Sequence, residues 1–190
     1  MTSDSIPIMA GAEPDGIGRI PEVQEVADRL AIHEVLSEHC RGVDRADQTT
    51  LESCYWPDAS VEYGAFVGGA HRFCGILPGL ISRYLATQHR VTNVTFRFAG
   101  PSARVESYVT AYHLQQPDQG GREMTYLGRY LDLFARRGDV WKLAHRKILM
   151  DWNQHVDGTV EWHAPGFEGI AVGGRAPDDI GVRFLNGDSD

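Results

Sequence analysis

The sequence lacks long apolar runs and holds few cysteines. No stretch of about 18 apolar residues occurs, so we expect no membrane-spanning helix and no membrane partner. Cys40, Cys54 and Cys74 are an odd number at unrelated spacings without a Cys-x-x-Cys motif, which is a poor disulfide framework. Residues 1–20 also lack the basic start and apolar core of a secretion signal. These absences predict reduced thiols and a cytoplasmic location.

Positive charge is scarce and scattered. The chain has 18 Lys and Arg residues against 26 Asp and Glu residues, for a formal net charge of −8. Arg72, Arg83, Arg90 and Arg97 are spread along the chain rather than clustered. Because nucleic-acid binding requires clustered Lys and Arg side chains, we expect no nucleic-acid partner.

Motifs for metals and nucleotides are also missing. His33 and His39 lie six residues apart on one predicted helix, which is not the i,i+4 spacing of a metal-binding pair, and no His-x-His or His-Glu-x-x-His motif occurs. The Gly68-Gly69 and Gly173-Gly174 pairs do not follow the pattern of phosphate-binding loops. We therefore expect no metal and no other cofactor.

The first half of the chain has helical patterns. Residues 1–20 are rich in Gly, Ser, Pro and acidic residues and are predicted to form a flexible arm. Apolar residues over 23–40 follow helical spacing, and Asp47 is suited to cap a second, short helix. Residues 76–85 predict a third helix, and Gly42 is expected to weaken the first one just before Asp44.

Strand patterns fill the second half. Four long segments are rich in β-branched and aromatic residues and are joined by short turns, which is typical of antiparallel hairpins: 91–98, 104–115, 124–134 and 140–152. Residues 59–63 predict a further short strand. The order of elements predicts an α+β domain over 21–154, a cone-shaped barrel in which a strongly curved mixed or antiparallel sheet and three N-terminal helices enclose a pocket. Residues 155–190 are expected to form an irregular tail.

Alternation along the strands suggests which side chains share a face. In the last strand Arg146 shares a face with Val140, Lys142, Ala144, Ile148, Met150 and Trp152. Arg146 is then either half-exposed, as strand arginines usually are, or directed into a pocket to hold an anion or a leaving group.

Two other strands carry candidate pocket residues. His113 shares a face with Val105, Ser107, Val109 and Ala111, either as a second pocket histidine or, more commonly, as a hydrogen-bonded wall residue. Tyr126 and Tyr130 flank Gly128 and suit a flat ligand, although tyrosines are common in any core.

Asp44 and His89 are the most informative residues. Each lies at the edge of an apolar segment. A carboxylate that holds one ring nitrogen of a histidine fixes its tautomer and makes the other nitrogen a better base. Such a pair is sufficient for proton-transfer chemistry.

These residues lie in motifs that resemble the nuclear transport factor 2-like superfamily, in its polyketide-cyclase-like branch with scytalone dehydratase, bile-acid 7α-dehydratase and hexachlorocyclohexane dehydrochlorinase. The resemblance covers about residues 22–152. It is carried by Gly42-Val43-Asp44-Arg45, Tyr55-Trp56-Pro57-Asp58-Ala59, His89 with Thr92-Asn93, and the segment from Ala135 to Leu143.

The resemblance implies specific roles. Asp44 and His89 match the pair that abstracts a proton in the dehydratases and the dehydrochlorinase, and Arg146 matches an assisting arginine of some members. These three residues are the predicted catalytic residues. The predicted substrate-binding residues are His39, Tyr63, Tyr84, Asn93, Ala111, His113, Tyr126, Tyr130 and Trp152.

We expect a cofactor-independent lyase that acts by dehydratase-like elimination on a small apolar or polycyclic substrate. The same residues would also suit a double-bond isomerase or a cyclase. The alternative is a non-catalytic member of the fold that binds a small ligand or scaffolds an oxygenase. Members of the branch are commonly trimers, and we expect a homo-oligomer, most simply a trimer, that buries an outer sheet face carrying Phe96, Phe98, Tyr108, Tyr112, Leu127, Leu131 and Leu133.

Overall fold

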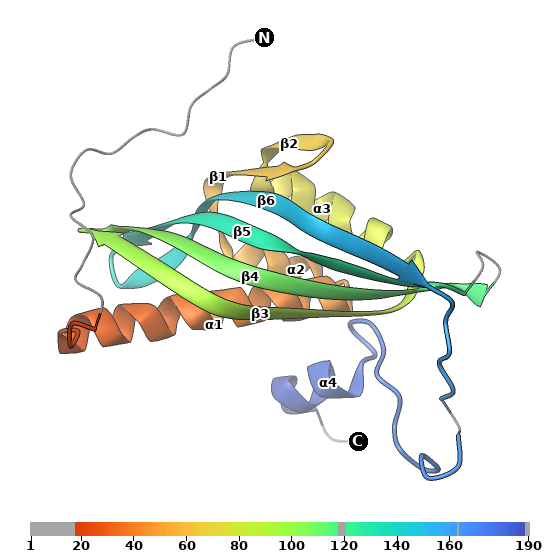
Figure 1. Cartoon of the computed structure of the whole chain (residues 1–190). Helices are drawn as coiled ribbons and strands as arrows, with labels where there is room; N and C mark the ends of the chain where they lie inside the picture. Colours follow the sequence, from red (N-terminus) through yellow and green to blue (C-terminus); the bar gives the residue numbers. More distant parts are fainter. Residues whose placement is uncertain (1–17, 118–120, 163, 189–190) are drawn as a thin grey trace.

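The computed structural model describes residues 18–117, 121–162 and 164–188. In chain order it has three helices with two shorter strands among them, then four long strands, and a fourth helix near the C-terminus (Figure 1). The elements are α1 Val23–Arg45, α2 Gln48–Ser53, β1 Tyr55–Tyr63, β2 Phe66–Gly69, α3 Ala70–Ile81, β3 Tyr84–Ala99, β4 Ser102–Gln115, β5 Glu123–Arg137, β6 Val140–Val156 and α4 Ile180–Asn186.

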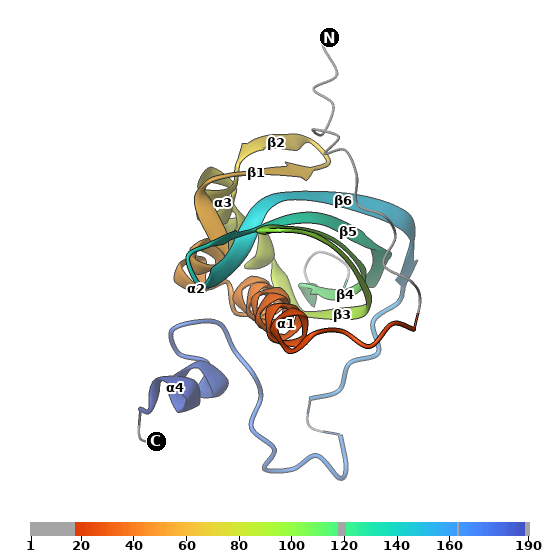
Figure 2. The ribbon, with the colours of Figure 1, turned by 90° about the vertical axis from the view of Figure 1, so that its left-hand side faces the viewer.

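All six strands form one sheet in the order β2-β1-β6-β5-β4-β3. β1 and β6 run parallel, whereas all other neighbouring strands run antiparallel. The sheet curls strongly, and α1 lies across its open side (Figure 2). The predicted fold class, α+β with a curved mixed sheet and N-terminal helices, is therefore confirmed.

Helix α1 continues three residues beyond the glycine that was expected to weaken it. Gly42 is buried, and a Cβ atom there would lie 3.0 Å from Leu51 Cγ of α2. The missing side chain thus lets α2 approach closely. The helix ends at Ala46, whose φ of 53° and backbone N–H bond to the Val43 carbonyl close the last turn. Asp44 consequently lies inside the last turn of α1 and not past its end.

Two predicted boundaries were wrong. Helix α3 spans Ala70–Ile81 instead of 76–85, because its buried face begins with Ala70 and Phe73. Residues 84 and 85 belong to β3, so Tyr84 and His89 lie on the same strand. The C-terminal tail is not wholly irregular either, since β6 extends to Val156 and α4 forms with Asp179 as its N-terminal cap. The predicted flexible arm falls almost entirely outside the described residues.

Two β-bulges reverse the expected faces of β3 and β6. In β3 the pairing shifts between Thr92 and Thr95, where Asn93 has a φ of 50°. Phe96 therefore faces inward, is 6% exposed and packs on His33, so Phe96 and Phe98 were wrongly assigned to the outer face.

The bulge in β6 acts in the same way. The partners of Leu133 and Phe134 are His145 and Leu143, so Ala144 is the extra residue. Before it Trp141 and Leu143 face the core, and after it Arg146 does. Val140 and Lys142 therefore do not share the face of Arg146, contrary to the simple alternation.

The hydrophobic core lies between α1, α3 and the concave side of the sheet, around Ile32, Leu36, Phe73, Phe134 and Leu143. Among the helices of the described residues, none is both long and apolar enough to cross a membrane.

Candidate active site

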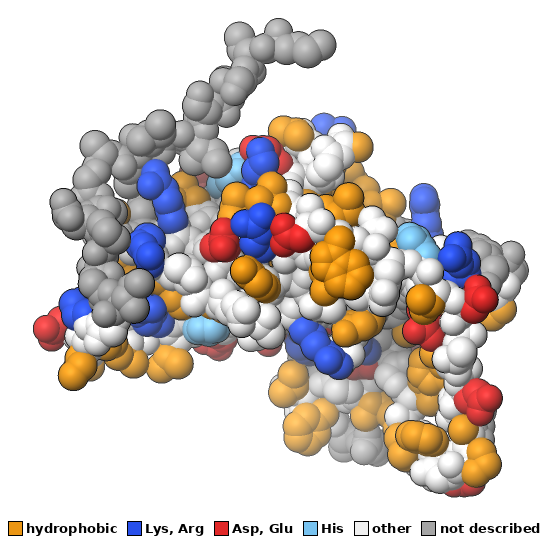
Figure 3. Space-filling view, viewed as in Figure 1, with side chains coloured by type: hydrophobic (Ala, Val, Ile, Leu, Met, Phe, Trp, Pro, Cys, Tyr) orange, Lys and Arg blue, Asp and Glu red, His pale blue; other side chains and the backbone are white. Residues whose placement is uncertain are grey.

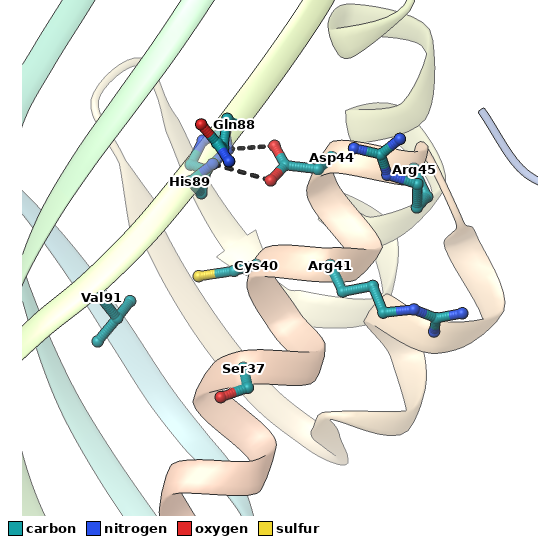
Figure 4. Close-up of a pocket in the computed structure, with 8 residues that line it drawn as sticks. All are labelled: Ser37, Cys40, Arg41, Asp44, Arg45, Gln88, His89 and Val91. Atoms are coloured by element: carbon teal, nitrogen blue, oxygen red, sulfur yellow. Dashed lines mark hydrogen bonds and ion pairs between the residues drawn. The ribbon is translucent and has the colours of Figure 1, made fainter. Parts of the chain in front are cut away.

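The Asp44 carboxylate joins the last turn of α1 to strand β3. It accepts one hydrogen bond from the ring Nδ1 of His89, at 2.7 Å from Oδ1, and a second from the backbone N–H of His89, at 2.8 Å from Oδ2 (Figure 4). Both side chains are only 9% exposed. The two residues therefore lie within hydrogen-bond reach of each other.

This geometry defines the state of the imidazole. Because a carboxylate only accepts hydrogen bonds, Nδ1 carries the proton and the lone pair of neutral His89 lies on Nε2. No hydrogen bond to Nε2 occurs within the described part of the chain. The arrangement provides a fixed imidazole with one nitrogen available as a base.

An open pocket of about 380 Å³ lies between α1 and β3 at this pair. In Figure 4 the side chains of Cys40 and Asp44 extend toward β3, whereas those of Arg41 and Arg45 extend away from it. Burial raises the pKa of the Cys40 thiol to about 12, so Cys40 contributes an apolar wall and no thiolate. The pocket is lined by Ser37, Cys40, Arg41, Asp44, Arg45, Gln88, His89 and Val91.

Arg146 is fully buried on the concave side of the sheet. Its Nε and Nη2 donate to the two carboxylate oxygens of Asp132, both at 2.7 Å. Its guanidinium carbon lies 4.0 Å from the centre of the Tyr130 ring. Burial alone would lower the pKa of Arg146, but the carboxylate of Asp132 raises it well above its ordinary value. The half-exposed alternative for Arg146 is thus excluded.

Several buried polar atoms on this side have no hydrogen-bond partner among the described residues. They include Arg146 Nη1, the Tyr63 hydroxyl, His39 Nδ1 and Ser107 Oγ. Buried polar groups are rarely left without a partner in native proteins, so such a group of atoms is typical of a site that receives water or a ligand. Ser107 was not among the predicted site residues, although it shares the predicted inward face with His113.

Two further histidines are held neutral by burial. Nε2 of His39 shares a hydrogen bond of 2.9 Å with the Tyr55 hydroxyl. Burial lowers the pKa of His39 well below its ordinary value. The ring of His113 lies between those of Tyr84 and His89, with centroid distances of 4.7 Å and 5.3 Å. Ala111, paired with His89 across the strands, completes this wall.

Three predicted substrate-binding residues have other positions. Tyr126 donates its hydroxyl to the Leu149 carbonyl at 2.6 Å, so that hydroxyl is already engaged. Asn93 lies exposed in the bulge of β3. Trp152 is 51% exposed and pairs with Leu127, because the pairing shifts between Leu127 and Gly128 and places Trp152 on the other face. Asn93 and Trp152 therefore do not join the inward-facing group.

A metal is not suggested by this arrangement. Within residues 18–117, 121–162 and 164–188, no group of three or more His, Cys, Asp or Glu side chains is placed to hold a metal ion.

The chain is similar to known proteins in sequence and in fold. The chain is 26% identical over 128 residues to the uncharacterized protein Rv2910c of Mycobacterium tuberculosis, covering 65% of this chain and 86% of the relative. The crystal structure of a type 2 hexachlorocyclohexane dehydrochlorinase (LinA) superposes with a TM-score of 0.67 at 22% identity, covering 76% of this chain and 98% of the other. A Novosphingobium aromaticivorans protein proposed to be a scytalone dehydratase superposes with a TM-score of 0.61 at 21% identity, covering 72% and 91%.

At this identity the two structures establish only a shared fold. The family follows from the sequence itself. Residues 24–147, well over half of the chain, match the SnoaL-like domain, and the protein therefore belongs to the SnoaL-like family of the nuclear transport factor 2-like superfamily.

Proposed function

We propose that the protein is a cofactor-independent lyase that catalyses a dehydratase-like elimination on a small apolar or polycyclic substrate. The observation that carries the proposal is the double hydrogen bond from His89 to Asp44, which leaves Nε2 of His89 unengaged within the described residues. A fixed imidazole beside a carboxylate is what proton abstraction from carbon requires. The elimination enzymes named among the structural neighbours lend support at the level of the fold.

In the proposed reaction, Nε2 of His89 takes a proton from a carbon next to an activating group. The electron pair of that C–H bond forms the new double bond while the C–O bond to the leaving hydroxyl breaks. Asp44 stabilises the imidazolium, which returns its proton to the departing hydroxyl, so that water leaves. A proton-transfer group of this kind contributes roughly 10²–10⁴-fold to the rate.

Arg146 suggests the polarity of the substrate. Its charge is already balanced by Asp132, and only Nη1 remains without a partner among the described residues. A donor from a neutralised pair suits an uncharged acceptor such as a carbonyl or hydroxyl oxygen better than a carboxylate. We therefore propose a substrate with an apolar body and an uncharged oxygen, held by Arg146 and Tyr63 with His39, Tyr84, His113 and Tyr130 around it.

The test begins by finding a ligand. Native mass spectrometry of the purified protein against hydroxylated steroids, polyketides and aromatic alcohols should identify a bound compound, and its conversion is followed as loss of one water. His89→Ala should abolish turnover, whereas the control His155→Ala, at an exposed position near the end of β6, should not. Asp44→Asn should lower kcat more than it raises KM. Full activity of His89→Ala would refute the role of His89 as the base.

A non-catalytic ligand binder is the second candidate. The unpartnered buried atoms of His39 and Ser107 would find partners in a bound ligand even without chemistry. Binding of a compound that is recovered unchanged by wild type and by His89→Ala alike would favour this function or an oxygenase-scaffolding role. A product with the mass of the substrate but a shifted double bond or a closed ring would instead indicate an isomerase or a cyclase.

A further inference from the structure

The last turn of α1 is fastened to the C-terminal segment. The last carbonyls of a helix lack partners within it, and here the Arg45 carbonyl accepts from the Ala176 N–H at 2.7 Å. The Arg45 guanidinium reaches the Gly174 carbonyl at 2.7 Å and the Asp179 carboxylate at 3.0 Å. Asp179 also caps α4 by accepting from the Val182 N–H at 3.0 Å. The C-terminal segment is thus hydrogen-bonded to the same helical turn that carries Asp44.

Arg175 makes the most direct contact between the C-terminal segment and Asp44. Its guanidinium donates to the backbone carbonyl of Asp44 and, at 2.9 Å, to Thr87 Oγ1. It also donates to the carbonyls of Tyr84 at 3.2 Å and Ile81 at 3.5 Å. These four acceptors belong to the end of α1, the end of α3 and the start of β3. The planar guanidinium can donate in several directions at once, so one side chain ties the three elements together.

Burial and the nearby Arg45 lower the pKa of Arg175, whereas the charge of Asp44 favours the guanidinium. The C-terminal end of a helix carries partial negative charge, which disfavours a carboxylate such as that of Asp44. The positive charge of Arg175, bonded to the carbonyl of the same residue, offsets this effect. Arg175 thus bonds to the backbone of Asp44 itself and, on the side of His89, to the hydroxyl of Thr87, two residues earlier in β3.

We propose that Arg175 is a positioning residue that sets the Asp44 carboxylate against the ring and backbone N–H of His89. It touches no substrate in this role and acts through the last turn of α1 and the start of β3. The catalytic consequence rests on the function proposed above, but the geometry itself is fixed before any substrate binds. The C-terminal segment is accordingly part of the site.

The test needs no substrate. In protein labelled with ¹⁵N, NMR measures hydrogen exchange of the His89 backbone amide, whose N–H donates to Asp44. The ¹⁵N chemical shifts of the His89 ring report its tautomer. Arg175→Gln should speed exchange of the His89 amide by about tenfold or more and remove the single fixed tautomer. The amide of Val109, in the adjoining strand β4, serves as the internal reference. Arg122→Gln, which loses a bond to the His155 carbonyl, is the matched control and should leave the His89 signals unchanged.

Unchanged His89 exchange and tautomer in folded Arg175→Gln would overturn the proposal. Should that variant fail to fold, Arg175→Lys keeps the charge but loses the planar fork, and Thr87→Val removes a single acceptor. Both are expected to give intermediate changes in the His89 signals, and wild-type signals in both would equally overturn the proposal. If the proposed lyase function proves wrong, this test still holds, because the His89 signals of the Arg175 variants are measured without any turnover.

Discussion

The imidazole of His113 lies edge-on to that of His89, with an angle of 81° between the ring planes. Burial, together with the nearness of His89, lowers the pKa of His113 to about 4. Two adjacent cationic rings would repel each other, and the burial of His113 avoids this by keeping it neutral. His113 therefore places no positive charge beside the imidazole of His89.

Stability should fall as the pH drops from about 6.5 toward 4. Below 6.5 the unfolded chain protonates His113, whereas the folded protein resists protonation down to about 4. The lowered pKa of His39 adds to the loss. Each such group contributes about 1.4 kcal/mol per pH unit within its window. Urea unfolding across this range should show the slope, and His113→Gln should reduce it while the exposed His155→Gln should not. An unchanged slope in His113→Gln would contradict the assignment.

The buried pair of Arg146 and Asp132 should be sensitive to loss of one partner. Asp132→Asn leaves the guanidinium uncompensated in the core, and such a change typically costs about 3–5 kcal/mol of unfolding free energy. A second comparison uses the single variants Asp132→Leu and Arg146→Met and the variant that combines them. The combined variant should lose clearly less unfolding free energy than the sum of the losses in the two single variants. Chemical denaturation of the four proteins measures this cycle. Strict additivity would show that the two side chains do not stabilise each other.

Gly128 should not tolerate a side chain. A Cβ atom there would lie 2.0 Å from the Leu149 carbonyl oxygen and 2.6 Å from the Tyr126 hydroxyl, which bonds to that same carbonyl. Gly128→Ala should therefore destabilise the protein by about 1–3 kcal/mol through overpacking. Gly79→Ala in α3 is the control, because nothing lies within 4 Å of a Cβ atom there. Equal melting temperatures for the two variants would contradict the steric argument.

The outer face of the sheet bears on the expected trimer. Tyr108 and Tyr112 are 48% and 42% exposed on this face. A groove of about 580 Å³ runs beside Leu131 and Leu133. Hydrophobic side chains on this side of the molecule alternate with charged ones (Figure 3). Loss of Phe96 and Phe98 from the predicted set makes this surface less apolar than the sequence suggested.

We still expect a homo-oligomer, most simply a trimer, with Tyr108 and Leu131 in its interface. Light scattering should give about three times the chain mass of 21.1 kDa. Tyr108→Glu with Leu131→Glu should shift the protein toward the monomer, because the paired carboxylates would be buried at the interface. A species of 21.1 kDa alone in the wild type would contradict the expectation.

The sequence was informative about the kinds of elements and about the Asp44–His89 contact. Helical and alternating patterns identified the N-terminal helices and the long strands, and the resemblance placed the acid and the histidine together. The faces of β3 and β6 were predicted less well, because one extra residue in a bulge exchanges the two sides of all that follows. The alternation of apolar and polar residues does not by itself show that Asn93 and Ala144 lie in bulges.

Other features could not be predicted because their partners are backbone atoms. Arg175 lies in a segment rich in Gly, Pro and Asp, and three of its four acceptors are carbonyl oxygens. Carbonyls occur at every residue, so no side-chain pattern marks them. Asp132 was missed for another reason. An acidic residue in a strand usually faces solvent, and only its pairing with the Arg146 side chain explains its burial.

Strand β3 is one of the two free edges of the sheet, so half of its backbone groups have no neighbouring strand. An uncovered edge of sixteen residues would be a template for pairing with another chain. Asp44 occupies the His89 N–H on this edge, and α1 lies alongside the strand. The carboxylate that orients the imidazole therefore also engages a backbone donor of this edge that could otherwise pair with another chain.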